Sequence, residues 1–337
     1  MKSQFHLFPN QCQERAGEDK KYMRILVTGG AGFIGSNFIK YILSKYDYTI
    51  VNYDNLTYAG NLQNLRTIEN NPNYHFVLGD IRNDPILINT VCDYGVDTIV
   101  NFAAETHVDR SIDDPEVFVK SNVNGTYNLV SLFFEDFGIQ KYIQISTDEV
   151  YGELTDSTSK FTEETPIEPN SPYSATKASA DLICRSFFET YGFPIIITRC
   201  SNNYGEDQYP EKLIPLMIDN AINDEKLPVY GSGDNVRDWI HVLDHCEAID
   251  TVLHKGRNGE VYNIGGNCEK TNLEIIEIIL KELGKSKDLI EFVEDRPGHD
   301  WRYAMDISKI QNELGWTPKI SLEDGLRKLI KGRTSNV

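Results

Sequence analysis

Two stretches of the sequence combine residue types that could move protons. Thr147, Asp148 and Glu149 follow directly on an apolar run, and Tyr173 stands four residues before Lys177. Adjacent carboxyl groups can serve as an acid and a base when their environments separate their pKa values. A Tyr and a Lys at positions i and i+4 share one face of a helix, where the ammonium group favours the phenolate. Each pattern alone is common by chance, because charged pairs usually lie on solvated surfaces.

A glycine-rich turn stands early in the chain. The segment Thr-Gly-Gly-Ala-Gly-Phe-Ile-Gly at 28–35 lies between an apolar run and a helical pattern. Such glycines allow a tight turn and the approach of a pyrophosphate to a helix N-terminus. About 20 residues later, the next apolar run ends at Asp54, whose carboxylate could hold a ribose diol and would repel a 2′-phosphate. The pattern predicts NAD as cofactor. The residues expected to bind it are Gly29, Gly32, Phe33, Ile34, Gly35, Asp54, Asp80, Ile81, Ala103, Ala104, Tyr173 and Lys177.

The elements that must position these residues alternate along the chain. Short apolar runs are separated by amphipathic segments, which is typical of a parallel sheet covered on both faces. We therefore expect an α/β fold, a Rossmann-type doubly wound parallel sheet with a smaller mixed α/β C-terminal substrate lobe. The expected strands are 25–27, 49–53, 74–78, 98–102, 142–146 and 195–199, and the clearest helical segments are 36–44, 114–134 and 174–191.

The domain organisation is expected to be interleaved. Residues 1–22 are polar without periodicity and are predicted to be a disordered leader. Residues 23–200 should form the NAD-binding Rossmann domain, and 201–337 mainly the substrate lobe. The segment at about 235–265 is expected to return to the first domain, because no Pro/Ser-rich linker separates the two halves.

Composition excludes several classes of protein. The formal net charge of −18 argues against nucleic acid as a partner, because such binding relies on clustered Lys and Arg. No apolar stretch approaches the roughly 18 residues that a membrane helix requires. The six cysteines are scattered without CxxC or Cys/His metal spacing, which favours reduced thiols and no metal site. A cytoplasmic protein is therefore expected.

Further blocks of sequence carry a family resemblance. Beyond TGGAGFIG and YSATK, they are AAETHVDRS (103–111), NVNGT (122–126), STDEVYG (146–152), RCSNNYG (199–205), YPEKLIP (209–215), NVRDW (235–239) and RPGHDWRYA (296–304). With them the chain resembles the extended short-chain dehydrogenase/reductase superfamily and, more narrowly, its dTDP-glucose 4,6-dehydratase family. The blocks span essentially all of residues 23–330.

The resemblance implies a reaction and a role for each proton-moving residue. The reaction is the NAD-dependent dehydration of dTDP-D-glucose to dTDP-4-dehydro-6-deoxy-D-glucose, most often as a step of dTDP-rhamnose biosynthesis. Tyr173 would deprotonate the C4 hydroxyl, with Lys177 setting the phenol pKa and Thr147 hydrogen-bonding the same oxygen. Glu149 would remove the C5 proton, and Asp148 would protonate the departing C6 hydroxyl. Asp148 then needs a raised pKa, and the chain must bend after Thr147 so that both carboxyl groups face one sugar.

The resemblance also implies substrate contacts and an oligomeric state. Arginine suits a pyrophosphate because its guanidinium group binds in a bidentate manner. A homodimer is expected through the helical segments 114–134 and 174–191. The residues expected to bind the nucleotide and sugar are Asn202, Glu211, Lys212, Leu213, Tyr230, Arg237, Asn272, Arg296 and His299.

Two alternative functions remain open at this point. A UDP-hexose 4-epimerase or a decarboxylase of the same fold would also oxidise C4, but an epimerase has no use for the Asp148–Glu149 pair. A non-catalytic NAD or nucleotide-sugar sensor could dispense with Tyr173 or Lys177, and both are present. The chain also departs from the family pattern at Glu206 and Asp207, where Pro and Tyr are usual, at His241, where Tyr is common, and in a short segment 152–170. These departures concern nucleotide preference and loop contacts.

Overall fold

The computed structural model describes residues 22–135, 137–295 and 298–334. Its centre is a seven-stranded sheet in the order β10-β6-β5-β4-β1-β2-β3, and every neighbouring pair is parallel. This order confirms the expected doubly wound Rossmann-type sheet, because the chain runs outward in both directions from β1. The strands are β1 (Arg24–Thr28), β2 (Thr49–Asp54), β3 (Tyr74–Leu78), β4 (Thr98–Asn101), β5 (Lys141–Thr147), β6 (Ile195–Cys200) and β10 (Val261–Ile264).

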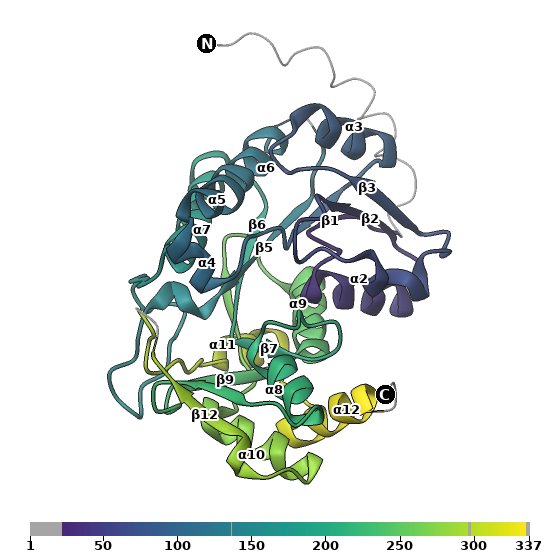
Figure 1. Cartoon of the computed structure of the whole chain (residues 1–337). Coiled ribbons are helices and arrows are strands. Elements are labelled where there is room, and N and C mark those ends of the chain that lie inside the picture. The colour runs from purple at the N-terminus through teal and green to yellow at the C-terminus, as the bar shows by residue number, and fades with distance from the viewer. Residues whose placement is uncertain (1–21, 136, 296–297, 335–337) are drawn as a thin grey trace.

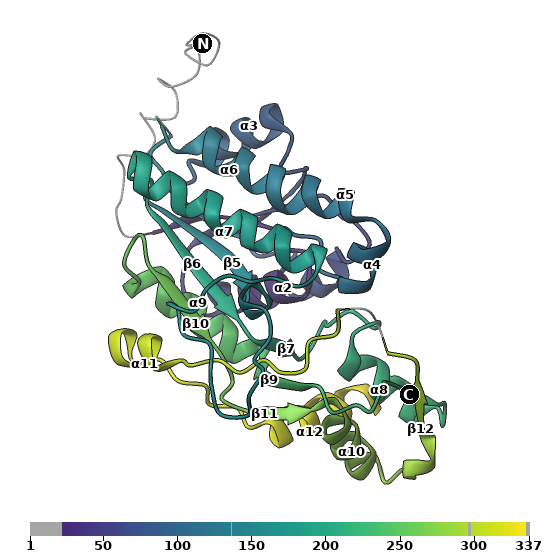
Figure 2. The ribbon, with the colours of Figure 1, turned by 90° about the vertical axis from the view of Figure 1, so that its left-hand side faces the viewer.

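Helices cover both faces of this sheet (Figures 1 and 2). The side chains of β1 alternate between the two faces, so Ile25 and Val27 join one hydrophobic cluster and Leu26 joins the other. The first cluster includes residues of α2 (Phe33–Lys45), α9 (Val242–Lys255) and α11 (Ser308–Leu314). The second includes residues of α3 (Asp84–Tyr94), α6 (Gly125–Phe133) and α7 (Pro172–Tyr191).

The segment that was expected to form one helix over 114–134 is more complex. It contains α5 (Pro115–Phe118), a π-helical segment η2 (Val119–Asn124) and then α6. The short helix α4 (Val108–Asp113) precedes it. A π-helical segment inserted between two α-helical segments often marks a functional site. Here it carries Asn122, whose side chain is buried.

A smaller lobe lies below the large sheet in Figure 1. Its hydrophobic cluster is built mainly from three helices that pack around Trp239 and Tyr204. The lobe holds a three-stranded sheet, β11-β9-β7, and a two-stranded sheet, β12-β8. Its elements are β7 (Asn202–Tyr204), α8 (Leu213–Ile222), β8 (Leu227–Tyr230), β9 (Val236–His241), β11 (Glu269–Thr271), α10 (Asn272–Leu283), β12 (Ile290–Val293) and α12 (Leu322–Thr334). Within the segment 235–265, β9 belongs to this lobe, whereas α9 and β10 belong to the larger unit.

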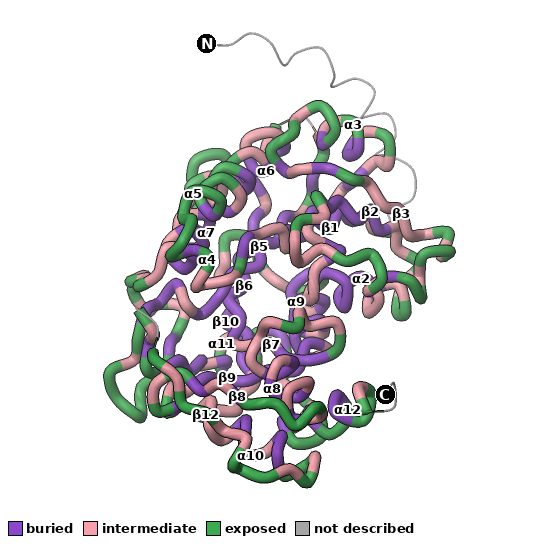
Figure 3. The backbone as a smooth tube through the Cα atoms, in the orientation of Figure 1, coloured by how far each residue is buried: buried purple, intermediate pink, exposed green. Residues whose placement is uncertain are grey.

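Buried residues are concentrated in the strands of the large sheet, and exposed residues lie mainly at the periphery (Figure 3). Among the described cysteines, Cys184, Cys200 and Cys246 are buried free thiols, and Cys268 is a partly exposed one. Cys92 is disulfide-bonded, so the expectation of reduced thiols is wrong for this residue. In the part of the chain that the structure describes, no helix is long and apolar enough to cross a membrane.

Candidate active site

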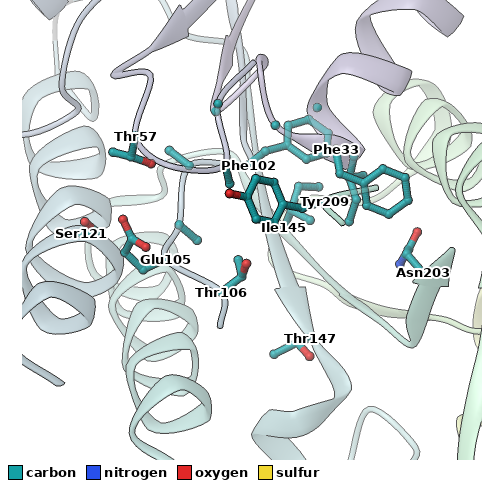
Figure 4. A pocket seen from close by; sticks show the side chains of 18 of the residues that line it. Phe33, Thr57, Phe102, Glu105, Thr106, Ser121, Ile145, Thr147, Asn203 and Tyr209 are labelled. Atoms are coloured by element: carbon teal, nitrogen blue, oxygen red, sulfur yellow. The ribbon is translucent and has the colours of Figure 1, made fainter. Parts of the chain in front are cut away.

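A cavity of about 330 Å³ opens at the carboxyl ends of the parallel strands, between the large sheet and the smaller lobe. Ligands bind at this edge of doubly wound sheets. Figure 4 shows the side chains of Phe33, Thr147 and Asn203, from α2, β5 and β7, around this cavity. All twelve residues expected to bind the cofactor line the cavity, and so do Thr147, Asp148 and Glu149. The structure therefore brings the expected cofactor and catalytic residues together in one place.

The backbone of the glycine turn packs so closely on its neighbours that side chains would not fit there. Gly29 has φ +69°, and a Cβ atom there would lie 2.7 Å from the backbone nitrogen of Ala103. A Cβ atom on Gly35 would lie 2.5 Å from the carbonyl oxygen of Gly29. Gly32 caps α2 without a side-chain hydrogen bond, so no side chain of the cap occupies the first amides of this helix. The turn can therefore hold an anionic pyrophosphate against the helix N-terminus.

Asp54 closes the cofactor end of the cavity. Its Oδ2 accepts a hydrogen bond from the backbone of Ala31 and its Oδ1 accepts one from Leu56, both at 2.8 Å. Each carboxylate oxygen keeps a free lone pair for a ribose hydroxyl. Burial raises the pKa of Asp54, and the two backbone hydrogen bonds oppose that shift. The free lone pairs of the Asp54 carboxylate therefore fit the ribose of NAD.

Nearby Asp80 is held in place by Arg82, whose hydrogen bonds keep the pKa of the Asp80 carboxyl group below its usual value.

The chain bends after Thr147, as predicted. Strand β5 ends at this residue, and a 3₁₀ turn, η3 (Asp148–Tyr151), follows at once. The Thr147 hydroxyl caps the turn by accepting a hydrogen bond from the backbone of Glu149 at 3.3 Å. Because an extended strand would point successive side chains to opposite faces, this turn is what lets Asp148 and Glu149 line the same cavity.

The two carboxyl groups have different environments. Asp148 is only 2% exposed, whereas Glu149 is partly exposed. Burial raises the pKa of Asp148 well above its ordinary value, and the charges of Glu149 and Asp238 add to the shift. Its Oδ1 accepts a hydrogen bond from the Thr147 hydroxyl at 3.2 Å, and its Oδ2 has no hydrogen-bond partner among the described residues. The pKa of Asp148 is therefore shifted in the direction that its predicted role as a proton donor requires.

Tyr173 and Lys177 lie on the first turns of α7, which begins with a reciprocal capping box between Ser171 and Ser174. The Lys177 ammonium group donates a hydrogen bond to the carbonyl oxygen of Ile145 at 2.6 Å. Burial lowers the pKa of Lys177. This anchor fixes the ammonium group against β5 and holds it inside the cavity lining.

Lys177 is not among the groups that shift the Tyr173 pKa in this structure, so its expected effect on the phenol stays a prediction. Burial raises the pKa of Tyr173 well above its ordinary value, and the charges of Glu149, Cys200 and Asp148 add to this, while a hydrogen bond with Thr147 opposes it. The physical reason is that desolvation disfavours the phenolate, and two neighbouring carboxyl groups repel it.

Two supporting contacts were not anticipated from the sequence. Asn122 is 1% exposed; it accepts a hydrogen bond from the backbone of Glu105 at 2.8 Å and donates to that residue's carbonyl and to Thr176, both at 3.0 Å. It thereby ties the cavity loop to α7. Arg199 of β6 and Asp181 of α7 form a buried ion pair at 2.9 Å, which joins this helix to the sheet. The sequence did contain a sign of this ion pair, because Arg199 is a charged residue within the otherwise apolar strand β6.

The predicted substrate residues divide into two groups. Asn202, Glu211 and Lys212 line the cavity. Glu211 is paired with Arg110 at 3.0 Å, and the Lys212 ammonium group donates to the carbonyl oxygen of Thr106 at 3.4 Å. These three residues stand where the smaller lobe meets the expected cofactor end.

The second group lies in the smaller lobe, away from the cavity lining. Leu213 begins α8 and packs on the hydrophobic cluster of that lobe. Arg237 is 5% exposed, donates to the carbonyl oxygens of Val236 and Asp300, and covers the ring of Tyr303. Their role in substrate binding stays a prediction, and Arg296 lies outside the described residues. Tyr230, Asn272 and His299 complete the group, with the rings of Tyr230 and His299 6.5 Å apart.

Within the described ranges, no cluster of three or more His, Cys, Asp or Glu residues could hold a metal ion. His107 and His241 serve instead as helix caps. The ring of His107 accepts from the backbone of Arg110 at 3.4 Å, and that of His241 accepts from Leu243 at 3.2 Å. The departure from the family pattern at position 241 is thus used structurally.

Comparison with protein families shows which family the chain belongs to. A family model described as GDP-mannose 4,6 dehydratase matches residues 26–329. The chain belongs to this family. Among curated members, it is 49% identical to the dTDP-glucose 4,6-dehydratase of Haemophilus influenzae over 92% of this chain and 97% of that protein. It is also 55% identical to the low-salt glycan biosynthesis protein Agl12 of Haloferax volcanii, over 91% of this chain and 97% of that protein. The resemblance read from the motifs is confirmed.

Solved structures of family members confirm the fold. A dTDP-glucose 4,6-dehydratase from Bacillus anthracis, in complex with NAD, is 55% identical with a TM-score of 0.87, over 93% of this chain and 97% of that one. The dehydratase DesIV from Streptomyces venezuelae, with NAD and dTDP bound, is 48% identical with a TM-score of 0.90, over 93% and 98%. A UDP-glucuronic acid 4-epimerase from Bacillus cereus also reaches 0.87, over 94% and 100%, but at 31% identity. Backbone shape therefore does not separate dehydratase from epimerase, whereas sequence identity favours the dehydratase.

Proposed function

We propose that the protein is an NAD-dependent dTDP-glucose 4,6-dehydratase, a lyase that converts dTDP-D-glucose to dTDP-4-dehydro-6-deoxy-D-glucose and water. The observation that carries this proposal is the placement of Asp148 and Glu149 in one cavity with Tyr173. The relatives with 46–55% identity described as dTDP-glucose 4,6-dehydratases support the same substrate.

The cofactor end of the cavity has a defined task. Gly29, Gly32 and Gly35 would leave room for the pyrophosphate of NAD, and Asp54 would accept a hydrogen bond from its adenosine ribose. When bound, NAD accepts a hydride from the sugar and returns it. The NAD-bound structures of close relatives support this assignment.

The chain's own residues move the protons. Tyr173 takes the proton of the C4 hydroxyl as C4 is oxidised, and Thr147 hydrogen-bonds the same oxygen. The C4 ketone acidifies the C5 proton, which Glu149 removes. Asp148, kept protonated by burial, gives its proton to the C6 oxygen as that oxygen leaves as water. Glu149 then returns its proton to C5, and the product is the 4-keto-6-deoxy sugar.

Two other functions account for fewer observations. A 4-epimerase on this scaffold would use Tyr173 and the cofactor but would leave a buried acid and a partly exposed base without a task. Burial of a carboxyl group costs free energy and here raises the pKa of Asp148. A non-catalytic sensor would give no reason for that cost. The dehydratase uses both groups.

We further propose that the protein acts as a homodimer. Helices α5, α6 and α7 lie together on one flank of the large sheet (Figure 2), and η2 packs with them. Large apolar side chains are exposed along these elements. They are Val117, Val119, Tyr127, Leu182 and Tyr191, each at least 40% exposed. Exposed apolar patches of this kind mark protein interfaces. A cytoplasmic location and a place in dTDP-rhamnose biosynthesis stay predictions.

The direct test is incubation of the purified protein with dTDP-glucose, UDP-glucose and GDP-mannose in separate reactions, followed by mass spectrometry. The proposal expects a product lighter by one water from dTDP-glucose, with no net accumulation of NADH. Tyr173→Phe should abolish that product and serves as the control for contaminating activity. A product of unchanged mass with inverted C4 would establish an epimerase, and no product from any of the three would contradict the dehydratase.

A further inference from the structure

One segment of the smaller lobe reaches across the cavity to the larger unit. This segment, residues 206–212, is here named the strap and connects β7 to α8. It has no regular secondary structure, and it is attached to the larger unit through side chains from three places in the sequence. Its residues on the cavity lining are Asp207, Gln208, Tyr209, Glu211 and Lys212.

The beginning of the strap is held to α2. The Asn37 amide group donates a hydrogen bond to the backbone carbonyl oxygen of Glu206 at 2.9 Å. Lys40, one turn further along the same helix, forms an ion pair with Asp207. Asp207 has φ +67°, a conformation that Asp adopts more readily than most residues. Position 207 is one of the departures from the family pattern, so this ion pair uses a residue that is unusual in the family.

The end of the strap is held by a cluster of aromatic and charged side chains. The rings of Tyr209 and Tyr58 meet edge to face, with 5.4 Å between their centroids. Glu211 forms an ion pair with Arg110 at 3.0 Å. The guanidinium group of Arg110 also lies over the ring of Tyr58, at 3.8 Å from its centroid. Arg110 therefore links the strap both directly and through Tyr58.

The attachment points stand close to the residues that hold the cofactor. Asn37 follows Gly35 by two residues, and Tyr58 follows Asp54 by four. Gly35, Asp54 and Tyr58 all line the cavity, as the strap does. A dinucleotide that lies on the glycine turn and on Asp54 is therefore enclosed between the edge of the large sheet and the strap.

We propose that the strap retains NAD from one turnover to the next, and that Lys40 and Arg110 are positioning residues that keep it closed. This inference rests on the proposed function. In that reaction the hydride taken from C4 is given back to C6, so the cofactor has no need to leave. Loss of the reduced cofactor in mid-cycle would strand the sugar as a ketone that still lacks its hydride. Retention of the cofactor keeps each cycle complete.

The test measures how fast NAD leaves the holoenzyme. Isotope-labelled NAD is loaded, excess unlabelled NAD is added, and the bound label is followed with time in Lys40→Met, Arg110→Met and the double variant. Neither Lys40 nor Arg110 lines the cavity, so neither substitution removes a direct contact to the cofactor. Lys45→Met is the matched control, because Lys45 also lies on α2 but forms its ion pair, at 2.6 Å, with Asp250 of α9.

Release of NAD should be about 3-fold faster in Lys40→Met, which loses one partly exposed ion pair. It should be about 10-fold faster in Arg110→Met, which loses an ion pair and a cation–π contact. The two effects should multiply in the double variant, because the contacts share no residue. Asp207→Asn should add nothing to Lys40→Met, because the ion pair is already lost.

Activity separates retention from general damage to the fold. At saturating NAD, kcat of Lys40→Met should match that of the wild type, and NADH should appear in solution only when the double variant turns over dTDP-glucose. Unchanged release of NAD in both single variants, or equally faster release in Lys45→Met, would overturn the strap. A wild type that holds NAD but forms no dehydrated product would instead overturn the proposed function.

Discussion

The two neighbouring carboxyl groups of the site should fail in different ways when each is removed. Asp148→Asn takes away the acid but leaves C4 oxidation and the base, so water loss should slow by about 100-fold or more while solvent deuterium still enters C5. Glu149→Gln should abolish both water loss and deuterium exchange at C5. Mass spectrometry and NMR of the sugar after incubation in heavy water measure both. Equal deuterium exchange in the two variants would contradict the assigned roles.

The burial of Asp148 also has a consequence for stability. A carboxyl group whose pKa is higher in the folded than in the unfolded state binds its proton more tightly when folded, so its contribution to stability is lost as the pH rises through the folded pKa. Asp148→Asn, which cannot ionise, should therefore melt about 2 °C or more above the wild type at pH 8. The difference should shrink toward pH 4.

Asp156 gives the opposite control. Backbone and side-chain hydrogen bonds from Ser159 and Thr158 lower the pKa of this exposed carboxyl group. Its contribution to stability is present above the unfolded pKa and lost in acid, so Asp156→Asn should lower the melting temperature at pH 8 rather than raise it. Thermal melts of both variants across pH check the sign. An Asp148→Asn protein that melts lower than the wild type at pH 8 would contradict the assigned environment.

At the scale of elements, the site depends on how α7 is tied to the sheet and to the loop after β4. Asn122 makes three hydrogen bonds, two of them to the backbone of Glu105 and one to Thr176. Asn122→Ala would leave buried backbone groups unpaired, which should lower the free energy of unfolding by about 2–4 kcal/mol. The loosened loop should also release NAD more readily.

Chemical denaturation and the amount of NAD retained after gel filtration measure these two effects. Asn220→Ala is the control, because Asn220 makes one exposed hydrogen bond in the smaller lobe, to the carbonyl oxygen of Lys226. It should change stability by less than about 1 kcal/mol and leave NAD retention unchanged. An Asn122→Ala protein as stable as the control would show that this side chain does not hold the loop.

The elements also show what sequence could predict. Apolar runs located the first six strands of the large sheet to within about two residues, because parallel strands buried on both faces are apolar throughout. The helix over 114–134 was predicted as continuous, but a π-helical segment interrupts it. Periodicity over such a length averages out one extra residue per turn. Asn122 was part of a family block, yet its contacts to Glu105 and Thr176 depend on tertiary structure.

For the site too, the sequence predicted which residues come together but not all of their contacts. Residue types and spacing were enough to bring Asp54, Asp148 and Tyr173 to one cavity, because the carboxyl ends of parallel strands share one edge. The expected effect of Lys177 on the pKa of Tyr173 stays a prediction. Spacing places Lys177 on the same helix face, but only coordinates show its hydrogen bond to Ile145 and the carboxyl groups near the phenol.

At the scale of the whole molecule, the proposed homodimer can be tested by sedimentation. Leu182→Glu places a charge at an exposed apolar position of α7, where the side chain is 53% exposed. If this flank is the interface, burial of that charge would be unfavourable and the protein should sediment as a monomer. Phe292→Glu is the control, because Phe292 is 59% exposed on β12 in the smaller lobe. A dimer that persists in Leu182→Glu, or a wild type that is monomeric, would contradict the proposal.

The central claim is that one cavity oxidises C4 of the sugar and delivers the same hydrogen to C6 after water is lost. The most direct measurement uses dTDP-glucose carrying deuterium at C4, with the product analysed by NMR. The account predicts that the deuterium appears at C6 of the 4-keto-6-deoxy sugar. Deuterium that remains at C4, or that is lost from the sugar, would contradict it.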